Sequence, residues 1–237
     1  MFSGWGVRPF STLIDRLPSQ CAVCRAWPSR PVCDACIARF AAPVPRCTTC
    51  ALPLPTADAG TQCADCIVRP PPLDACLAAC DYAWPWPEHI ARFKFHGDAG
   101  WATPFATLMR SAPWVELRIE QCDLVLPMPL SKERLRQRGF NQAHELARRL
   151  APGKTDATLL LRTRDTPAQS TLLRADRLRN LQGAFAVEPL RQDAVRGRRV
   201  VLIDDVMTSG ASLFTAATAL RTAGASHIAA VVLARTA

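Results

Sequence analysis

The clearest pattern of apolar and polar positions lies near the carboxyl end of the chain, where two apolar runs flank a helical segment. Residues 200–203 form an unbroken apolar run, which predicts a strand buried on both faces. Residues 213–222 have helical character, and Gly224 follows them where a helix commonly ends. Residues 227–234 form a second apolar run and predict a second strand. The pattern therefore indicates a β-loop-α-β unit of an α/β protein.

Similar patterns upstream predict further strands and helices, followed by a polar segment. Strands are expected at residues 77–84, 123–129 and 159–161. Helices are expected at residues 10–17, 87–97, 101–111 and 141–150. Residues 162–185 are polar, rich in arginine and end in a short apolar stretch, so we expect them to form a flap over a site rather than part of the core.

Two neighbouring acids, Asp204 and Asp205, follow the predicted strand at residues 200–203 and precede a loop of small, hydroxylated residues. Ligands of open α/β sheets bind beyond the carboxyl ends of the strands. A small loop entering a helix offers backbone N–H groups to an anion, and Gly210 lets a ligand approach the backbone. A ribose 5-phosphate would satisfy both halves, with its hydroxyls on the acids and its phosphate in the loop. The candidate binding residues are Asp204, Asp205, Val206, Met207, Thr208, Ser209, Gly210, Ala211 and Ser212.

The alternative for this stretch is a strand that ends in a capped helix, with both acids as turn residues. Two adjacent acids at the end of a buried strand are costly unless something binds them, which favours the ligand interpretation.

A second candidate anion site follows the predicted strand at residues 123–129. Residues 131–142 are expected to form a loop that carries four clustered cations, Lys132, Arg134, Arg136 and Arg138. The alternative is a solvated basic surface. Lys94 could also reach an anion, although a surface lysine is the simpler interpretation, and His89 and His96 are expected to be solvated helix residues.

Cysteine is abundant, and most of the 11 cysteines occur in Cys-x-x-Cys pairs. Such a pair presents two thiolates from one turn, and two pairs complete a tetrahedral zinc site, so we expect a structural double zinc ribbon with two ions. We expect consecutive pairs to share an ion, although interleaved pairing, disulfides and a redox role remain alternatives. Cys76, Cys80 and Cys122 are expected to be buried apolar residues. The candidate metal ligands are Cys21, Cys24, Cys33, Cys36, Cys47, Cys50, Cys63 and Cys66.

Composition narrows the class of protein. With 237 residues, 49% of them hydrophobic, the chain can form one large domain and a small module. The formal net charge of +9 favours anionic partners, although high arginine usage in a GC-rich genome explains it equally well. We see no run of 18 apolar residues and no signal peptide, so we expect a cytoplasmic protein without membrane insertion.

Residues 199–212 closely resemble the phosphoribosyl-pyrophosphate (PRPP) motif of type I phosphoribosyltransferases, in which two acids precede a Thr/Ser-rich loop containing glycine. The likeness extends in order through the Cys pairs, Phe-Lys-Phe-His-Gly, Pro-Met-Pro, Arg-Gly-Phe-Asn-Gln, Arg-x-Thr-x-x-Gln, Arg-x-x-Asn and Ala-Phe. Over about residues 20–236, the chain therefore resembles the ComF family, which joins a double zinc ribbon to a phosphoribosyltransferase-like domain.

The resemblance implies a type I phosphoribosyltransferase-like parallel sheet flanked by helices at residues 76–237, preceded by a tail at 1–20 and the zinc ribbon module at 21–69. It implies that Asp204 and Asp205 hold the ribose hydroxyls as candidate catalytic residues, that the loop holds the 5-phosphate, and that Mg²⁺ accompanies PRPP. By the same resemblance, Arg134, Arg136 and Arg138 bind the pyrophosphate.

Two main hypotheses for function follow. The first is Mg²⁺-dependent transfer of phosphoribose to an unidentified acceptor. The second, which the family name implies, is a non-catalytic protein of DNA uptake in natural competence that binds single-stranded DNA and works with competence proteins. Residues that stack on bases are scarce near the basic segment, which counts against the second hypothesis. A regulator that senses PRPP is a third, weaker interpretation.

Overall fold

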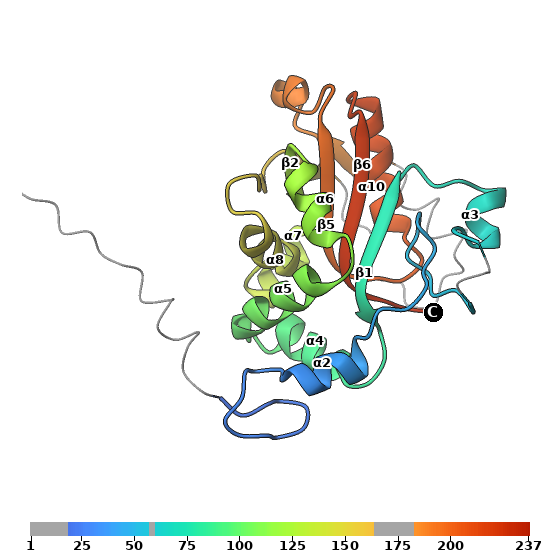
Figure 1. Ribbon diagram of the computed structural model, residues 1–237. Helices are drawn as coiled ribbons and strands as arrows, with labels where there is room; N and C mark the ends of the chain where they lie inside the picture. Colours follow the sequence, from blue (N-terminus) through green and yellow to red (C-terminus); the bar gives the residue numbers. More distant parts are fainter. Residues whose placement is uncertain (1–18, 57–59, 164–182) are drawn as a thin grey trace, which may run out of the picture. The chain divides into compact units, whose positions relative to one another are not determined.

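A computed structural model describes residues 19–56, 60–163 and 183–237 (Figure 1). The helix expected at residues 10–17 and most of the flap expected at 162–185 lie outside the described residues.

Four parallel strands form the central sheet, in the order β1-β6-β5-β2 (Figure 1). The long runs of apolar residues explain this arrangement, because a strand buried on both faces needs apolar side chains on both. A second sheet of two antiparallel strands, β3 and β4, follows separately. The strands are β1 (Ala75–Asp81), β2 (Leu124–Pro127), β3 (Leu160–Arg162), β4 (Phe185–Val187), β5 (Arg199–Met207) and β6 (His227–Arg235).

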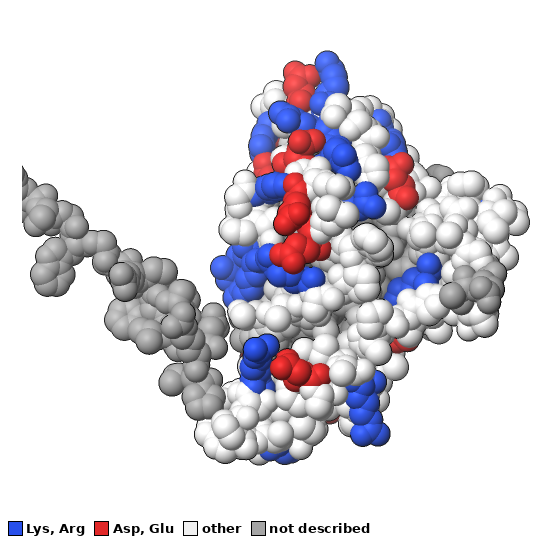
Figure 2. Space-filling model, in the orientation of Figure 1, with Lys and Arg blue, Asp and Glu red and all other residues white. Residues whose placement is uncertain are grey.

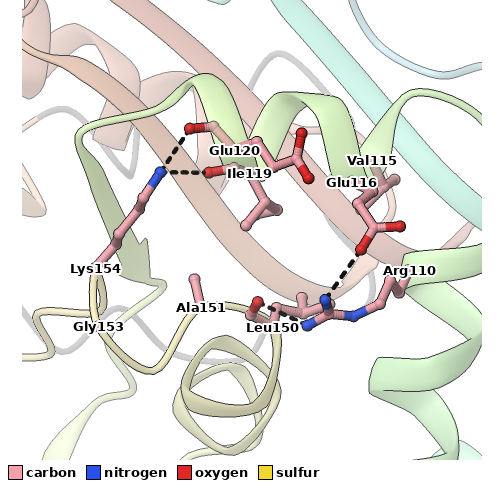
Figure 3. Close-up of a pocket in the computed structure, with 9 residues that line it drawn as sticks. All are labelled: Arg110, Val115, Glu116, Ile119, Glu120, Leu150, Ala151, Gly153 and Lys154. Carbon is pink, nitrogen blue, oxygen red and sulfur yellow. Dashed lines mark hydrogen bonds and ion pairs between the residues drawn. The ribbon is translucent and has the colours of Figure 1, made fainter.

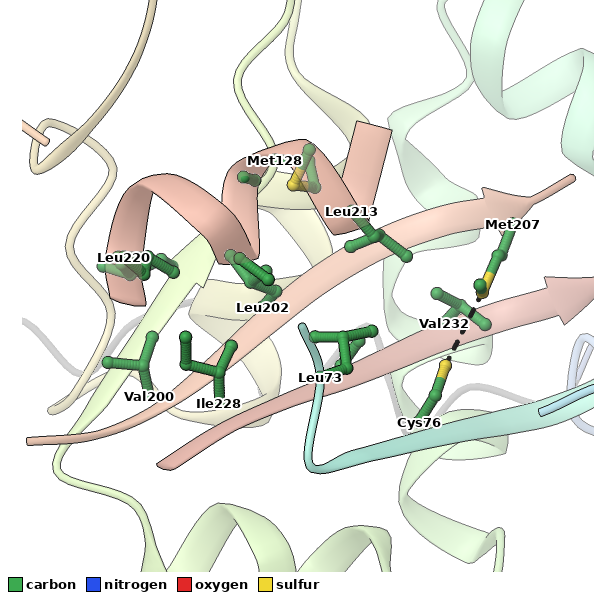
Figure 4. Packing of buried hydrophobic residues seen from close by; sticks show 14 of the residues in the cluster. Leu73, Cys76, Met128, Val200, Leu202, Met207, Leu213, Leu220, Ile228 and Val232 are labelled. Carbon is green, nitrogen blue, oxygen red and sulfur yellow. Dashed lines mark hydrogen bonds between the residues drawn. The ribbon is translucent and has the colours of Figure 1, made fainter. Parts of the chain in front are cut away.

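Helices cover both faces of the central sheet. Helices α5, α6 and α8 contact the sheet on the side drawn in front in Figure 1, whereas α10 packs behind β5 and β6. Leu202, Leu213 and Leu220 interdigitate between α10 and the sheet (Figure 4). The helices are α2 (Asp34–Phe40), α3 (Ala64–Val68), α4 (Trp86–Phe95), η2 (Ala99–Trp101), α5 (Ala102–Ser111), α6 (Val115–Gln121), α7 (Lys132–Arg138), α8 (Gln142–Leu150), η3 (Pro189–Ala194) and α10 (Ala211–Thr222).

The chain divides into two compact units, Met1–Arg39 and Phe40–Ala237. The smaller unit contains the cysteines of the first two pairs, and the larger unit contains those of the last two pairs together with the central sheet. The domain limits expected at residues 21–69 and 76–237 stay a prediction.

The structure differs from the sequence-based expectation in several places. The segment expected as a basic loop forms α7. The hydroxyl of Ser131 accepts a hydrogen bond from the N–H of Arg134 at the start of the helix, and Gly139, with φ +78°, ends it. Helix α6 was not expected. Strand β5 continues through Met207, because it keeps pairing with β6 as far as Arg235. The predicted glycine end of α10 is confirmed, since Gly224 has φ +90°.

Candidate functional site

The acid pair, Asp204 and Asp205, lies in the last part of β5. Asp204 is partly exposed, whereas Asp205 is buried, with 6% of its surface accessible. The backbone N–H of Asp205 donates to Oδ1 of Asp204 over 2.9 Å. The end of a buried parallel strand thus carries two carboxylates in very different surroundings.

Lys94, near the end of α4, binds the buried member of the acid pair. Its Nζ lies 2.8 Å from Oδ1 of Asp205, and only 17% of its side chain is exposed. The interpretation of Lys94 as a surface lysine is therefore wrong. His89 on the same helix is also buried and stacks on Trp101 with ring centroids 4.4 Å apart, so it is not a solvated residue. His96 stays exposed at the helix end.

The charge of the acid pair is unevenly stabilised. Burial and the negative charge of Asp205 raise the pKa of Asp204 from 3.8 to about 7, while Lys94 and Arg138 act in the opposite direction. Near neutral pH, Asp204 can therefore exist either as an acceptor-only carboxylate or as a protonated acid that also donates a hydrogen bond.

Residues 208–212, which were expected to hold a phosphate and are called the phosphate loop for that reason, join β5 to α10. Within the described part of the chain, no acceptor is bound to the backbone N–H groups of Thr208, Ser209, Gly210 and Ser212. The N–H of Ala211 makes a weak contact of 3.4 Å to the hydroxyl of Ser209. Gly210 has φ +78°, a conformation that glycine adopts without a steric penalty. Four neighbouring N–H groups at the start of a 12-residue helix are thus available to an anion.

The basic helix α7 contributes unevenly to this region. Arg138 interacts electrostatically with both acids, and burial lowers the pKa of its guanidinium, an effect that the acids oppose and Arg134 increases. Lys132 and Arg136 are exposed, and the described residues include no contact between them and the acid pair. Of the predicted cation cluster, the structure therefore brings Arg138 into electrostatic interaction with the acid pair.

An aromatic side chain that the sequence did not single out lies beside Arg138. The guanidinium of Arg138 lies 5.2 Å from the centroid of the Phe95 ring, and Phe95 is 66% exposed. The ring follows Lys94 directly on α4, so an exposed aromatic surface borders the acid pair. Its only sequence signal was its place within the Phe-Lys-Phe-His-Gly motif.

The eight paired cysteines form two clusters. The first cysteine cluster is Cys21, Cys24, Cys33 and Cys36, and the second cysteine cluster is Cys47, Cys50, Cys63 and Cys66. Within each cluster the four sulfur atoms lie within 4.8 Å of one another. The predicted grouping of consecutive pairs is confirmed.

The sulfur separations fit zinc. Four thiolates about 2.3 Å from a zinc ion have sulfur–sulfur distances of about 3.8 Å. The separations are 3.9 Å for Cys21–Cys36, 3.6 Å for Cys24–Cys33 and 3.7 Å for Cys50–Cys63. A disulfide would need about 2.05 Å. Each cluster can therefore hold one structural zinc ion.

The remaining thiols are buried, as predicted. Burial raises the pKa of Cys76 and of Cys80 to about 12, and it also raises the pKa of Cys122. These three are inert apolar residues rather than ligands.

A cavity of about 300 Å³ lies away from the acid pair, beside the start of β2 (Figure 3). Lys154 donates to the carbonyl oxygens of Ile119, Glu120 and Cys122, and Arg110 contacts the carbonyl of Leu150. These cations complete the ends of α6 and α8, which is a structural role.

On the face drawn in Figure 2, Lys and Arg are interspersed with Asp and Glu. No helix among the described residues is long and apolar enough to cross a membrane.

The fold and the two cysteine clusters define a phosphoribosyltransferase-like domain with a zinc-ribbon module. Residues 135–237 match the model of the phosphoribosyl transferase domain. The chain is 29% identical to the DNA utilization protein YhgH of Escherichia coli (strain K12) over 229 residues, which cover 93% of this chain and 98% of that protein.

Two further relatives carry names from competence. Competence protein F of Haemophilus influenzae is 31% identical over 173 residues, covering 70% of this chain and 75% of that protein. Competence protein ComFC of Bacillus subtilis is 33% identical over 133 residues, covering 56% of this chain and 52% of that protein. The chain belongs to the ComF family of phosphoribosyltransferase-like proteins.

Proposed function

We propose that the acid pair and the phosphate loop bind PRPP, and that the protein transfers its phosphoribosyl group to an acceptor. The observation that carries the proposal is the row of unpartnered N–H groups in the phosphate loop, directly after two acids at the end of a parallel strand. The N–H groups suit the 5-phosphate, and the acids suit the ribose hydroxyls.

Asp205 can serve a ligand while it stays paired with Lys94. A carboxylate has two oxygens, and Lys94 contacts only Oδ1. Lys94 supplies the opposite charge beside the buried carboxylate, and hydrogen bonds to a charged acceptor are stronger than those to a neutral group. In this proposal, Lys94 is a positioning residue for Asp205.

Breaking the bond between ribose C1 and pyrophosphate leaves negative charge on the leaving group. Arg138 interacts electrostatically with both acids and with Arg134, so we assign these two arginines to the pyrophosphate. Mg²⁺ bound to the pyrophosphate would supply further positive charge against it. Lys132 and Arg136, which are exposed on α7, would meet only a ligand that extends out of the site.

The names of the relatives support a role in DNA utilization or competence. Binding of single-stranded DNA is a second candidate function, and the specific observation in its favour is the exposed Phe95 ring under the Arg138 guanidinium. Aromatic and arginine side chains stack on bases of any sequence. In this second function, single-stranded DNA would place a base on Phe95 and a phosphate near the phosphate loop.

Calorimetric titration of the full chain with PRPP and Mg²⁺ tests the first function. We expect Asp204→Asn with Asp205→Asn to weaken binding at least about a hundredfold, because hydrogen bonds to charged groups contribute about 1.5–3 kcal/mol each. Asp193→Asn is the matched control, since this side chain is 88% exposed on η3. Equal affinities of the double variant and the control would exclude the acids from the site, and pyrophosphate release with candidate acceptors would identify turnover.

Fluorescence titration with single-stranded DNA tests the second function. We expect Phe95→Ala to weaken binding about tenfold, because stacking contributes about 1–3 kcal/mol per base. Trp114→Ala is the control, because Trp114 is equally exposed at the start of α6. A strong loss in the control, or none in Phe95→Ala, would contradict stacking at this ring.

A further inference from the structure

Arg235, the last residue of β6, is buried with 5% of its surface accessible. Its Nε donates to the carbonyl oxygen of Cys50 over 2.9 Å, and its Nη1 lies 3.4 Å from the carbonyl oxygen of Met207. Nη1 also contacts Thr236, through both its carbonyl and its hydroxyl. One guanidinium thus joins the second cysteine cluster to the residue that precedes the phosphate loop.

Met207 is held from further directions. The N–H of Thr236 donates to its carbonyl oxygen over 3.1 Å, and the sulfur of Cys76 lies 3.6 Å from its own sulfur (Figure 4). Its methyl group lies against Gly210, since a Cβ on that glycine would be 2.5 Å from Cε of Met207. The backbone and side chain of Met207 together support the turn that exposes the loop N–H groups.

The turn between Cys47 and Cys50 is fixed to the sheet by two hydrogen bonds. Besides the Cys50 carbonyl bound by Arg235, the carbonyl oxygen of Thr48 accepts the N–H of Cys76 on β1 over 2.8 Å. The second cysteine cluster also shares one apolar core with Met207 and α10. Its metal geometry and the position of the loop therefore depend on the same contacts.

Charge supplies a second reason for this coupling. Among the described residues, Arg235 has no carboxylate partner, although a buried guanidinium is costly without an opposite charge. Four thiolates outweigh the charge of one zinc ion, so a loaded second cysteine cluster is negative and lies next to Arg235. Zinc loading would provide the counter-charge that this arginine lacks in the carbonyl contacts alone.

We infer that the second cysteine cluster is the structural support of the phosphate loop, and that Arg235 is the positioning residue that connects them. Loading of this cluster then sets how well the loop is ordered. The consequence for PRPP affinity rests on the function proposed above, whereas the ordering of the loop does not.

Hydrogen exchange of single amides tests the coupling without any ligand. The N–H groups of Thr236 and Phe214 are the reporters, because they donate to the carbonyls of Met207 and Gly210, and Val125, which donates to Lys154, is the reference. We expect the Arg235→Lys variant to keep both zinc ions. Its amide hydrogens should exchange about tenfold faster at the two reporters only, since an ammonium group cannot bridge the carbonyl oxygens of Cys50 and Met207.

Two cysteine variants provide a matched comparison. Cys63→Ser removes a ligand of the second cysteine cluster and Cys33→Ser one of the first, and elemental analysis should show one zinc ion fewer in each. We expect faster exchange at Thr236 and Phe214 only in Cys63→Ser. If Cys63→Ser fails to fold, Arg235→Lys still decides the question.

Unchanged exchange in Arg235→Lys, or equal acceleration at the reference Val125, overturns the inference. Titration with PRPP then separates it from the proposed function. If the wild-type chain binds PRPP, Arg235→Lys should bind it about tenfold more weakly. If the wild-type chain binds none while the exchange result holds, the proposed function fails and the coupling stands.

Discussion

Replacing Gly210 by alanine adds one methyl group to the turn between β5 and α10, at the centre of the phosphate loop. The backbone there has φ +78°, which a residue with a Cβ adopts only with strain. The new Cβ would also lie 2.5 Å from Cε of Met207 and 2.6 Å from Cζ of Phe214, both well inside van der Waals contact. The change therefore has a backbone cost and a packing cost.

The two costs can be separated with a second glycine. Gly139, at the end of α7, has the same φ of +78°, but an added Cβ there would meet no atom within 4 Å. We expect Gly139→Ala to lower the free energy of unfolding by about 1–2 kcal/mol, the cost of the left-handed backbone. Gly210→Ala should lower the free energy of unfolding by about 1–3 kcal/mol more, because it overpacks the turn. Movement of the ends of the Met207 and Phe214 side chains would make this additional loss smaller.

Urea unfolding followed by tryptophan fluorescence measures both values, because Trp86 and Trp101 are buried in the larger unit. Equal losses in the two alanine variants would mean that Met207 and Phe214 do not pack tightly under the turn. The same pair of variants should differ in PRPP affinity, since only Gly210 lies within the loop proposed to bind the ligand, and its turn must shift to accept the methyl group.

Lys94→Met should destabilise the fold by about 3 kcal/mol, because it leaves Asp205 buried without its charge partner, and adding Asp205→Asn should recover part of the loss in urea unfolding. Since burial and Asp205 raise the pKa of Asp204 from 3.8 to about 7, the folded chain retains a proton that the unfolded chain releases, so stability should fall as pH rises through this range. Asp204→Asn should abolish that decline between about pH 4 and pH 7, and parallel curves for variant and wild type would contradict it. Elemental analysis should find two zinc ions per chain, one for each cysteine cluster, and chelation should lower the unfolding temperature.

Features of the fold that depend on neighbours in sequence could be predicted from the sequence. The apolar runs of β5 and β6 and the glycine after α10 act locally. Strand β6 and the end of α10 lie where they were expected, and β5 includes the expected residues 200–203 but continues to Met207. The cysteine pairs behaved likewise, because the spacing within a pair fixes which two sulfur atoms can share a turn. Helix α7 was missed because its charged residues were interpreted as an anion-binding loop, although Ser131 and Gly139 were available as end signals.

The parts of the site that depend on distant segments could not be predicted in this way. Nothing near Lys94 indicates that it binds Asp205, and nothing near Arg235 indicates that it binds the carbonyl of Cys50, 185 residues away. The sequence around a lysine or an arginine looks the same whether its side chain is solvated or buried. Only the assembled fold supplies the opposite charge or the carbonyl oxygen that offsets the cost of burying it. The contiguous motif from Asp204 to Ser212 therefore identifies which ligand to test, whereas we propose that Lys94 and Arg235 hold that motif in the shape that binds it.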